Sequence, residues 1–524
     1  MEDEVGLRVS DADGYRGTIR YVGSVEGTSG VWYGVDWDNG SRGKHDGSHN
    51  GVKYFWTHSP KSGSFMRRDK LLFGVSFTEA MVTKYVEADN ELVVRETVEE
   101  AKTSMNAPFL ELVGFEQVAE EQKSFETLKI VSLVDSRVSH AGSTHDEVER
   151  TVPNIEDLDL SRNLLASWFA VGDITRQLKR LKHLNVSNNK LPVPNDMDGV
   201  MEQIFPQGQM STLTLGNMGY IWADILKLFA TFPITILKVP TNHITTLDSI
   251  PNMFQVLEEL YLQENNIVDW SEVNALGELP KLKYLNLAST NLRNIKLEPG
   301  PGGGDGGPLF PALETLIISD NKIDSWDYVS QLHYLPKLSS LRFTKNPIWS
   351  ADRVANSRDK TICRIGTLTV LNGSTIEKQE RRGSEYSYIK EYGAIWLSEK
   401  NRKEFVIANP RYEYLVNLHG PPLAELSGPA GSTASIATKH IILLNFHHTA
   451  DDKTVQKKVP LTLSISKLVN LVQRLFGNSS NVSTMYYTSE KNQLQHIELN
   501  PESLSEIKFF DLQEGDTVHV TFEE

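Results

Sequence analysis

The chain has 524 residues, 39% of them hydrophobic, and a net charge of −15. This length predicts two to four domains rather than one core, and the acidity argues against nucleic acid as the partner. A single cysteine excludes a disulfide framework and suits a reducing cytosol, and no apolar run or leader pattern predicts membrane insertion or secretion.

Residues 5–74 combine frequent glycines with short β-like runs. The runs at 17–22, 31–37 and 52–56 are separated by glycines, which supply the positive-φ turns of a small, bent sheet. The region also holds more aromatic side chains than a core of about 70 residues needs, so we expect some of them to line a groove. These aromatic residues are Trp32, Trp37, Phe55 and Phe65.

The turn at 43–47, Gly-Lys-His-Asp-Gly, indicates what such a groove binds. Its backbone N–H groups and the Lys44 side chain can together hold a terminal carboxylate. The turn and its surroundings resemble the CAP-Gly family, whose domains capture acidic C-terminal tails ending in Glu-Glu-Tyr or a close relative, such as that of α-tubulin. The resemblance implies that Lys44 meets the carboxylates and that Trp32 and Phe55 flank the aromatic ring of the tail. The residues it assigns to tail binding are Trp32, Gly43, Lys44, His45, Asp46, Gly47, Phe55 and Phe65.

Charge is unevenly distributed over the first 126 residues. Residues 1–78, expected to form the CAP-Gly domain, carry ten Lys/Arg and ten Asp/Glu, whereas residues 79–126 carry four against twelve. We expect the second segment to be an acidic connector that includes the N-terminal cap of the next domain. Because an acidic chain cannot attract an acidic tail over long distances, the local geometry around Lys44 has to provide the binding. His45, which stands where the family usually has Asn, keeps a hydrogen-bond donor and adds a titratable ring.

From Leu128 onward the chain repeats the pattern L-x-x-L-x-L-x-x-N-x-L at spacings of 23 to 31 residues. Seven units are regular, one of them with Thr290 in the Asn position, and two are degenerate, with Ser136 and Met218 there. The pattern predicts a leucine-rich repeat solenoid of about nine turns with a C-terminal cap, over residues 127–395, in which each turn adds one parallel strand. The glycine-rich run at 299–308 lacks the Lys-Ser/Thr of a phosphate loop and predicts a flexible insertion.

Side chains between the strand leucines are expected on the concave face of the solenoid, where such folds usually bind. They are Asp157, Asp159, His183, Asn185, Ile236, Lys238, Glu259, Tyr261, Tyr284, Asn286, Ile317 and Arg342. An apolar patch ringed by charge is predicted among them, suited to a folded protein partner. The predicted partner-binding residues are Ile236, Lys238, Tyr261, Tyr284 and Ile317.

After a linker expected at 396–438, residues 439–524 predict a small mixed domain. Strands are expected at 441–446, 454–459, 485–487 and 517–522, and apolar spacing predicts a helix between the second and the third. This order resembles the ubiquitin-like β-grasp family. Because the sequence ends in Phe-Glu-Glu rather than Gly-Gly, we expect a binding module that is not conjugated to other proteins.

The predicted fold class is a multidomain α/β and β protein with a small β CAP-Gly domain, a leucine-rich repeat solenoid and a ubiquitin-like domain. This order resembles the tubulin-folding cofactor E family. The resemblance implies a cytoplasmic, cytoskeleton-associated chaperone that binds α-tubulin through its tail and body and takes part in assembly and dissociation of the αβ-tubulin heterodimer. It also implies cofactor D with β-tubulin and cofactor C as partners, with cofactor B and the proteasome as further candidates.

The sequence carries no pattern that predicts catalysis. It has no phosphate loop and no nucleophile elbow, and Asp46-Gly47 between His45 and His49 breaks any helix that could pair these histidines on a metal. We therefore expect no enzyme activity, no cofactor or metal, and no nucleic-acid or membrane partner. Two alternatives stay open, a CAP-Gly microtubule plus-end or trafficking adaptor and a leucine-rich repeat regulatory subunit. An adaptor usually has a coiled coil, and no sustained heptads predict one.

Overall fold

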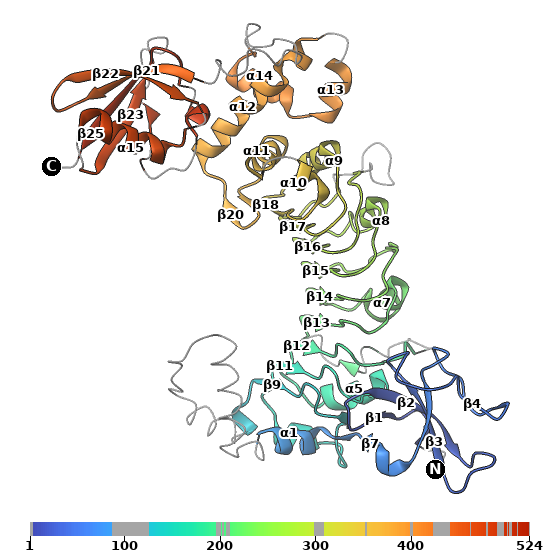
Figure 1. Ribbon diagram of the computed structural model, residues 1–524. Helices are drawn as coiled ribbons and strands as arrows, with labels where there is room; N and C mark the ends of the chain where they lie inside the picture. Colours follow the sequence, from blue (N-terminus) through green and yellow to red (C-terminus); the bar gives the residue numbers. More distant parts are fainter. Residues whose placement is uncertain are drawn as a thin grey trace. The chain divides into compact units, whose positions relative to one another are not determined.

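The computed structural model describes two compact units of the chain (Figure 1). The first consists of residues 1–324 and 334–347, and the second of residues 325–333 and 348–524. Within them the described residues are 4–85, 125–194, 201, 204–205, 210–297, 309–351, 354–398, 402–422, 441–461, 463–477, 480–489, 497–499, 501, 506–510 and 512–522. Most of the expected acidic connector, the glycine-rich insertion up to residue 308 and the second half of the expected linker lie outside these residues.

The N-terminal domain is a five-stranded antiparallel sheet in the order β6-β3-β2-β1-β7. Its strands are β1 (Arg8–Ser10), β2 (Arg16–Gly23), β3 (Trp32–Trp37), β6 (Gly63–Met66) and β7 (Leu72–Phe73), with a hairpin of β4 (Ser48–His49) and β5 (Val52–Lys53) and a 3-10 turn at Arg68–Lys70. Val9, Ile19, Val35 and Trp37 form the core between them. The run expected at 52–56 pairs only at its first two residues, and Trp56 is 80% exposed.

A strand pair and an ion pair connect this domain to the start of the solenoid within the first unit. Strand β8 (Val75–Ser76) pairs in parallel with β10 (Val138–His140), and the guanidinium of Arg16 lies 2.5 Å from the Asp135 carboxylate. Helix α1 (Phe77–Tyr85) follows directly and buries Phe77. Gly74 is needed at this junction, because a Cβ there would lie 2.2 Å from the Ser139 hydroxyl.

Among the described residues, nine parallel strands form the sheet of the solenoid, each pairing in register with the next (Figure 1). They are β9 (Ile130–Ser132), β11 (Asp157–Asp159), β12 (His183–Asn185), β13 (Thr212–Thr214), β14 (Ile236–Lys238), β15 (Glu259–Tyr261), β16 (Tyr284–Asn286), β17 (Thr315–Ile317) and β18 (Ser340–Arg342). The central residue of every strand is buried, because it is the leucine or valine of the repeat. The predicted leucine-rich repeat fold is confirmed.

Short helices return the chain between strands on the other side of the solenoid, as Figure 1 shows for α7 and α8. Those of the first unit are α4 (Glu147–Thr151), α5 (Trp168–Thr175), α7 (Trp222–Phe229) and α8 (Trp270–Asn274), with a 3-10 turn at Phe125–Thr127. Three of them begin with a tryptophan that is at most 1% exposed, so each helix is anchored in the core by its first residue. Side-chain caps stabilise the first turns of α5 and α8. The Ser167 side chain accepts the N–H of Ala170, and the Asp269 side chain accepts the N–H of Ser271.

The repeat asparagines join each turn to the turn before it. The Asn163 side chain, which is fully buried, donates to the carbonyls of Leu133 (2.7 Å) and Leu160 (2.9 Å), and its Oδ1 accepts the N–H of Val138 (2.8 Å). In each of the nine turns, the residue before the Asn position has a positive φ although it is not glycine. These residues are Asp135, Arg162, Asn188, Asn217, Thr241, Glu264, Ser289, Asp320 and Lys345.

The second unit contains a helical region with its own core. Its elements are α9 (Trp326–Gln331), α10 (Pro347–Ala351), α11 (Val354–Arg364), the hairpin of β19 (Val370–Leu371) and β20 (Ser374–Thr375), α12 (Lys378–Leu397), α13 (Arg402–Ala408) and α14 (Tyr412–His419). Helices α13 and α14 lie where we expected a linker at 396–438. They are packed rather than extended, because Phe405, Tyr412 and Leu415 are buried in one cluster with Tyr388 and Trp396 of α12. Composition alone did not reveal this aromatic cluster.

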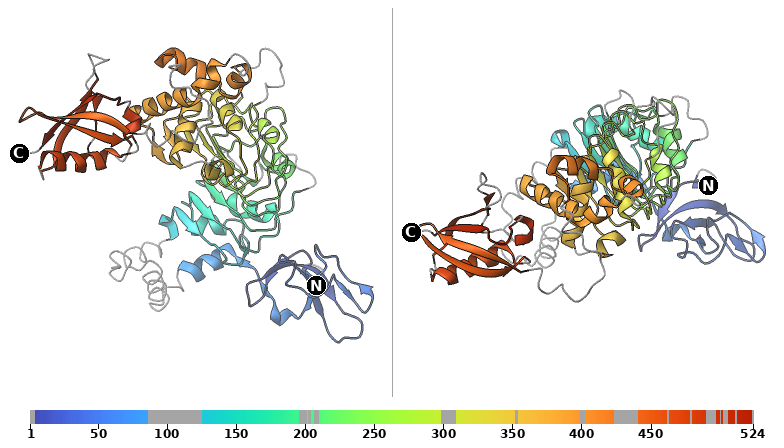
Figure 2. Two further views of the ribbon diagram at one scale, coloured as in Figure 1. Left: turned by 45° about the horizontal axis from the view of Figure 1, so that its top comes forward. Right: turned by 90° about the horizontal axis from the view of Figure 1, so that it is seen from above.

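The C-terminal domain is a five-stranded mixed sheet in the order β22-β21-β25-β23-β24, with α15 lying against one face (Figure 2). Its elements are β21 (Ile441–His448), β22 (Lys453–Pro460), α15 (Ile465–Phe476), β23 (Val482–Thr488), β24 (Ile497–Glu498), a 3-10 turn at Ile507–Phe510 and β25 (Thr517–Phe522). Leu468 and Val472 of the helix pack on Phe446 and Val518 of the sheet. The parallel pairing of β21 with β25 completes the β-grasp arrangement that the sequence predicted.

Candidate functional site

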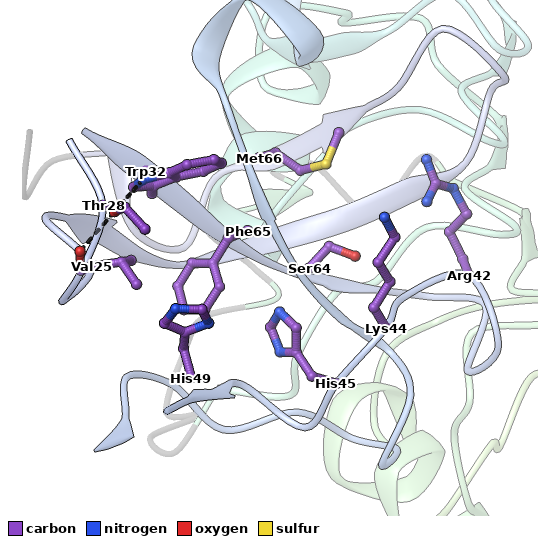
Figure 3. Close-up of a pocket in the computed structure, with 10 residues that line it drawn as sticks. All are labelled: Val25, Thr28, Trp32, Arg42, Lys44, His45, His49, Ser64, Phe65 and Met66. Atoms are coloured by element: carbon purple, nitrogen blue, oxygen red, sulfur yellow. Dashed lines mark hydrogen bonds between the residues drawn. The ribbon is translucent and has the colours of Figure 1, made fainter. Parts of the chain in front are cut away.

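A groove of about 390 Å³ lies beside the edge strand β6 of the N-terminal domain (Figure 3). Trp32, Thr28 and Val25 stand at one end of it, and Lys44 and Arg42 at the other. The described residues that line it are Val25, Thr28, Trp32, Arg42, Lys44, His45, His49, Ser64, Phe65 and Met66. The groove therefore offers an apolar end and a cationic end to one ligand.

The turn at 43–47 is held against β6 by backbone hydrogen bonds. The N–H of Lys44 donates to the Gly63 carbonyl (2.7 Å), and the N–H of Gly63 donates to the His45 carbonyl (2.9 Å). Gly43 and Gly47 are both required, for different reasons. A Cβ on Gly43 would lie 2.4 Å from the backbone of Ser62, and Gly47 has a φ of +94°. This close fit fixes where the Lys44 side chain starts.

Lys44 is the cation of the groove that is available to a ligand. It is exposed and forms no ion pair with any residue that the structure describes. Arg42, by contrast, is held by Asp11 at 2.6 Å and lies over the Trp37 ring. Lys53 is paired with Asp46 at 2.9 Å, and its hydrogen bond lowers the pKa of Asp46 to about 2. A carboxylate entering the groove therefore meets Lys44 first.

His45 is a neutral part of the groove wall. Its Nδ1 accepts the N–H of Gly47 (3.0 Å), and its ring centroid lies 5.0 Å from that of Phe65 and 6.1 Å from that of Phe55. Burial among these groups lowers the pKa of His45 below that of a free imidazole. The ring therefore acts at neutral pH as a hydrogen-bond acceptor that fixes the turn.

Aromatic rings and their contacts build the apolar end of the groove. Phe65 contacts the edges of Tyr54 and Phe55, at centroid distances of 5.5 and 5.4 Å. The Trp32 indole donates to the Thr28 hydroxyl (2.8 Å). The guanidinium of Arg67 lies 3.7 Å from the centroid of the Trp32 ring. Such preformed aromatic walls bind a ligand side chain at low entropic cost.

Ser64 contributes a polar group to the floor of the groove that sequence reasoning missed. Its hydroxyl is buried and has no hydrogen-bond partner among the described residues. Figure 3 shows the hydroxyl directed to the side where Lys44 stands. An unpaired buried hydroxyl is unfavourable in the free protein, so this group is suited to a ligand that supplies the missing partner.

The structure places the eight predicted tail-binding residues in two groups. Four of them line the groove, namely Trp32, Lys44, His45 and Phe65. The other four, Gly43, Asp46, Gly47 and Phe55, are not among the lining residues, and Phe55 is only 4% exposed. The lining residues that we did not predict are Val25, Thr28, Arg42, His49, Ser64 and Met66. The two-residue period of β6 could not have revealed Ser64 and Met66, because both alternate with Phe65 along the strand.

The predicted concave-face residues lie in two adjacent columns along the solenoid sheet. Ile236 and Tyr284 share one column, and Lys238, Tyr261 and Ile317 share the next. The rings of Tyr261 and Tyr284 lie 4.8 Å apart, and the Lys238 ammonium stands 5.1 Å from the Tyr261 ring. Tyr261 also donates to Glu259 (2.8 Å), and burial raises its pKa further above the usual value. The contact unites the two columns in one half-buried surface.

The described residues offer neither a metal cluster nor a membrane span. No three His, Cys, Asp or Glu side chains there gather in a way that could hold a metal ion. No described helix has both the length and the apolar character needed to span a membrane.

The comparisons with known proteins agree with this architecture. The CAP-Gly domain model matches residues 5–71. Tubulin-specific chaperone E of Bos taurus is 34% identical over 535 residues, covering 99% of this chain and 98% of its own, and that of Homo sapiens has the same identity and coverage. The solved structure "Bik1 CAP-Gly domain with ETF peptide from Bim1" is 38% identical, with a TM-score of 0.13, and covers 13% of this chain and 82% of its own.

The fold and the groove define a three-domain CAP-Gly protein with a leucine-rich repeat solenoid and a ubiquitin-like domain. Its similarity to the bovine and human proteins extends over nearly the whole of both chains. The chain belongs to the tubulin-specific chaperone E family.

Proposed function

We propose that this protein is a tubulin-folding chaperone that captures the acidic C-terminal tail of α-tubulin in the groove beside β6. The observation that carries the proposal is the position of Lys44, an ammonium group without an ion-pair partner among the described residues, at the end of an aromatic groove. A tail carboxylate would pair with this ammonium, and the aromatic side chain of the tail would pack on the aromatic wall that Phe65 forms, with Trp32 further along the groove. Membership of the tubulin-specific chaperone E family supports tubulin as the source of the tail.

The concave face of the solenoid is the proposed second contact, with the body of α-tubulin. Lys238, Tyr261 and Tyr284 form its centre, where two tyrosine rings in contact lie beside a cation. Aromatic side chains in such positions often dominate the energy of an interface. Two weak contacts on one chain act as a stronger one, because binding of the tail raises the effective concentration of the body to roughly millimolar.

The role proposed for this pair of contacts is to hold α-tubulin during assembly of the αβ heterodimer and, in reverse, to separate the dimer. The partners that join at these steps are β-tubulin with cofactor D, then cofactor C, with cofactor B and the proteasome as candidates for the ubiquitin-like domain. The protein contributes binding rather than catalysis, and we place it in the cytoplasm with the cytoskeleton.

Gel filtration with unpolymerised αβ-tubulin tests this proposal. The purified full chain is mixed with dimer, and each fraction is analysed separately for α- and β-tubulin. We expect α-tubulin to enter a complex without its β partner, and Lys44→Ala to reduce that fraction. Lys61→Ala, which alters an exposed lysine of the same domain outside the groove, is the matched control. Tubulin that elutes only as an intact dimer, with the protein following polymerised microtubules, would instead favour the adaptor.

A further inference from the structure

Strand β6 has one paired edge and one open edge. It is the outermost strand of its sheet, with β3 as its strand neighbour among the described residues, and its first residue, Gly63, also forms an isolated bridge with His45. In that pairing Val35 lies opposite Ser64 and Tyr33 opposite Met66, and the Trp37 N–H donates to the Ser62 carbonyl (2.9 Å). Hydrogen-bonded pairs alternate with non-bonded pairs in an antiparallel ladder. The backbone groups of Ser62, Ser64 and Met66 therefore point toward β3, and those of Gly63 and Phe65 point to the open edge.

The turn at 43–47 occupies only the first part of this open edge. Gly63 exchanges hydrogen bonds with Lys44 and His45, as described above. The next outward position on the edge is Phe65, and no described residue accepts its N–H or donates to its carbonyl there. Its side chain lines the groove. The groove is therefore bordered by a strand edge with one donor and one acceptor available.

We propose that the groove takes the tail peptide as an added β-strand, which exchanges backbone hydrogen bonds with the outward N–H and carbonyl of Phe65. Strand addition at an exposed sheet edge is a general mode of peptide recognition, in which main-chain bonds supply affinity and side-chain pockets supply specificity. This inference rests on the proposed function, because it describes how the same tail is held. The occupant is an acidic peptide in the extended conformation.

The turn also determines which end of the peptide enters the groove. Because residues 43–45 already cover Gly63, an added strand cannot continue along the edge in that direction. The strand has to end at the turn, where Lys44 and the unpaired hydroxyl of Ser64 can receive a terminal carboxylate. The preceding residues then run toward Trp32 and Thr28 at the opposite end of the groove.

A scan of single backbone N-methylations in the ligand tests the added strand. An eight-residue acidic peptide ending in Glu-Glu-Tyr, and variants methylated in turn at each of its last four amide nitrogens, are titrated against the full chain by fluorescence anisotropy. Successive N–H groups of a strand point to opposite sides, so only the one that donates to Phe65 should matter. We expect that variant to lose about tenfold or more in affinity and both of its neighbours to stay within about twofold.

The possible outcomes separate this inference from the proposed function. Equal affinities across the scan, or equal losses at two adjacent positions, would overturn the added strand while the unmodified peptide still binds. Failure of the unmodified peptide to bind would overturn the tail-capture proposal and this inference with it.

Amide hydrogen exchange of the full chain gives an independent check on the protein side. In the free protein the Phe65 N–H should exchange rapidly, and peptide binding should slow it about tenfold or more. The N–H groups of Ser64 and Met66 already bond to β3, so their exchange should change much less. Unchanged exchange at Phe65 on saturation with the peptide would overturn the proposal.

Discussion

His45 packs its imidazole against Phe65, with ring centroids 5.0 Å apart, while its Nδ1 accepts the N–H of Gly47. One side chain therefore supports both the aromatic wall of the groove and the turn that carries Lys44. Burial holds the pKa of His45 below the usual 6.5, so the folded domain favours the neutral ring. Protonation would remove the acceptor at Nδ1 and release the turn.

This pKa predicts how the stability of the CAP-Gly domain depends on pH. Because the folded pKa is depressed, the unfolded chain binds the proton more readily, and the stabilisation is complete above pH 6.5 and is lost as the pH falls below it. His45→Asn keeps an acceptor but cannot titrate, so we expect this variant to lose less stability than the wild type between about pH 7.5 and 5.5. Denaturant unfolding followed by tryptophan fluorescence measures the difference. Parallel pH profiles for the two proteins would contradict it.

Lys44→Ala should weaken binding of an acidic C-terminal peptide by about tenfold or more, since a charge-assisted hydrogen bond is lost. The fold should stay intact, because the turn is held by backbone hydrogen bonds of Lys44 rather than by its side chain. Isothermal titration with the full chain measures the affinity, and Lys61→Ala should bind like the wild type. An unchanged affinity for Lys44→Ala would show that the carboxylate is held elsewhere.

Ser64→Ala should change stability and affinity in opposite directions. The substitution removes a buried hydroxyl that has no partner among the described residues, so the free protein should become more stable, by about 1 kcal/mol. Peptide affinity should fall about threefold to tenfold, because the ligand loses a hydrogen bond. Chemical denaturation and peptide titration of the same preparation provide both numbers. Loss of stability would mean that the hydroxyl is satisfied in the free protein.

Asn265→Ala should destabilise the solenoid by about 3 kcal/mol, because its amide joins two turns. It donates to the carbonyls of Val239 (3.0 Å) and Leu262 (2.9 Å) and accepts the N–H groups of Asn242 and Ile244. Asn265→Thr is the matched control, because Thr290 occupies the same position in another turn and still donates to Leu287 (2.9 Å). Chemical denaturation should rank Thr between Asn and Ala. Equal stabilities of the Thr and Ala variants would contradict this order.

Replacing both Tyr261 and Tyr284 with alanine should weaken α-tubulin binding by about tenfold while binding of the isolated tail peptide stays unchanged. The two rings are half-buried on the concave face. The side chains that these two strands direct into the core are Leu260 and Leu285, which are fully buried and are not substituted. Thr214→Ala, on the same face two strands before Tyr261, is the control. Equal α-tubulin affinities of the double variant and the wild type would remove the tyrosine pair from the interface.

The repeats could be predicted because each structural feature of a turn depends on one residue type at one position of the pattern. Every strand centre is a leucine or valine of the pattern, and the Asn position recurs at fixed distance from it, so a single register placed all nine strands. Apolar spacing also predicted the helix and four strands of the C-terminal domain, whereas the two-residue strand β24 was not predicted.

The groove was predictable only in part, because its lining depends on contacts across the sheet. Lys44 and Phe65 were found through their motif, whereas Arg42, His49 and Ser64 reach the groove from positions that share no sequence pattern. Phe55 was assigned to the wall on the same motif, yet it lies behind Phe65, since Gly34 and Gly47 leave room for its ring below the surface. The burial of the Phe55 ring thus depends on the backbone of neighbouring segments, which the motif itself does not specify.

Each repeat asparagine bonds to the turn before it in the chain, and this direction has a consequence for biosynthesis. The N–H groups of Met218, Gly219 and Tyr220 all bond to the Asn242 side chain, which follows 24, 23 and 22 residues later. At about 5 to 20 residues per second, the ribosome delivers that acceptor roughly 1 to 5 seconds after these donors. Each newly made turn therefore completes these hydrogen bonds only after the next turn has been synthesised. The solenoid thus forms from its N-terminal end. A protein that assists tubulin folding thus exposes its own newest turn, while it is being made, to proteases and to other chaperones.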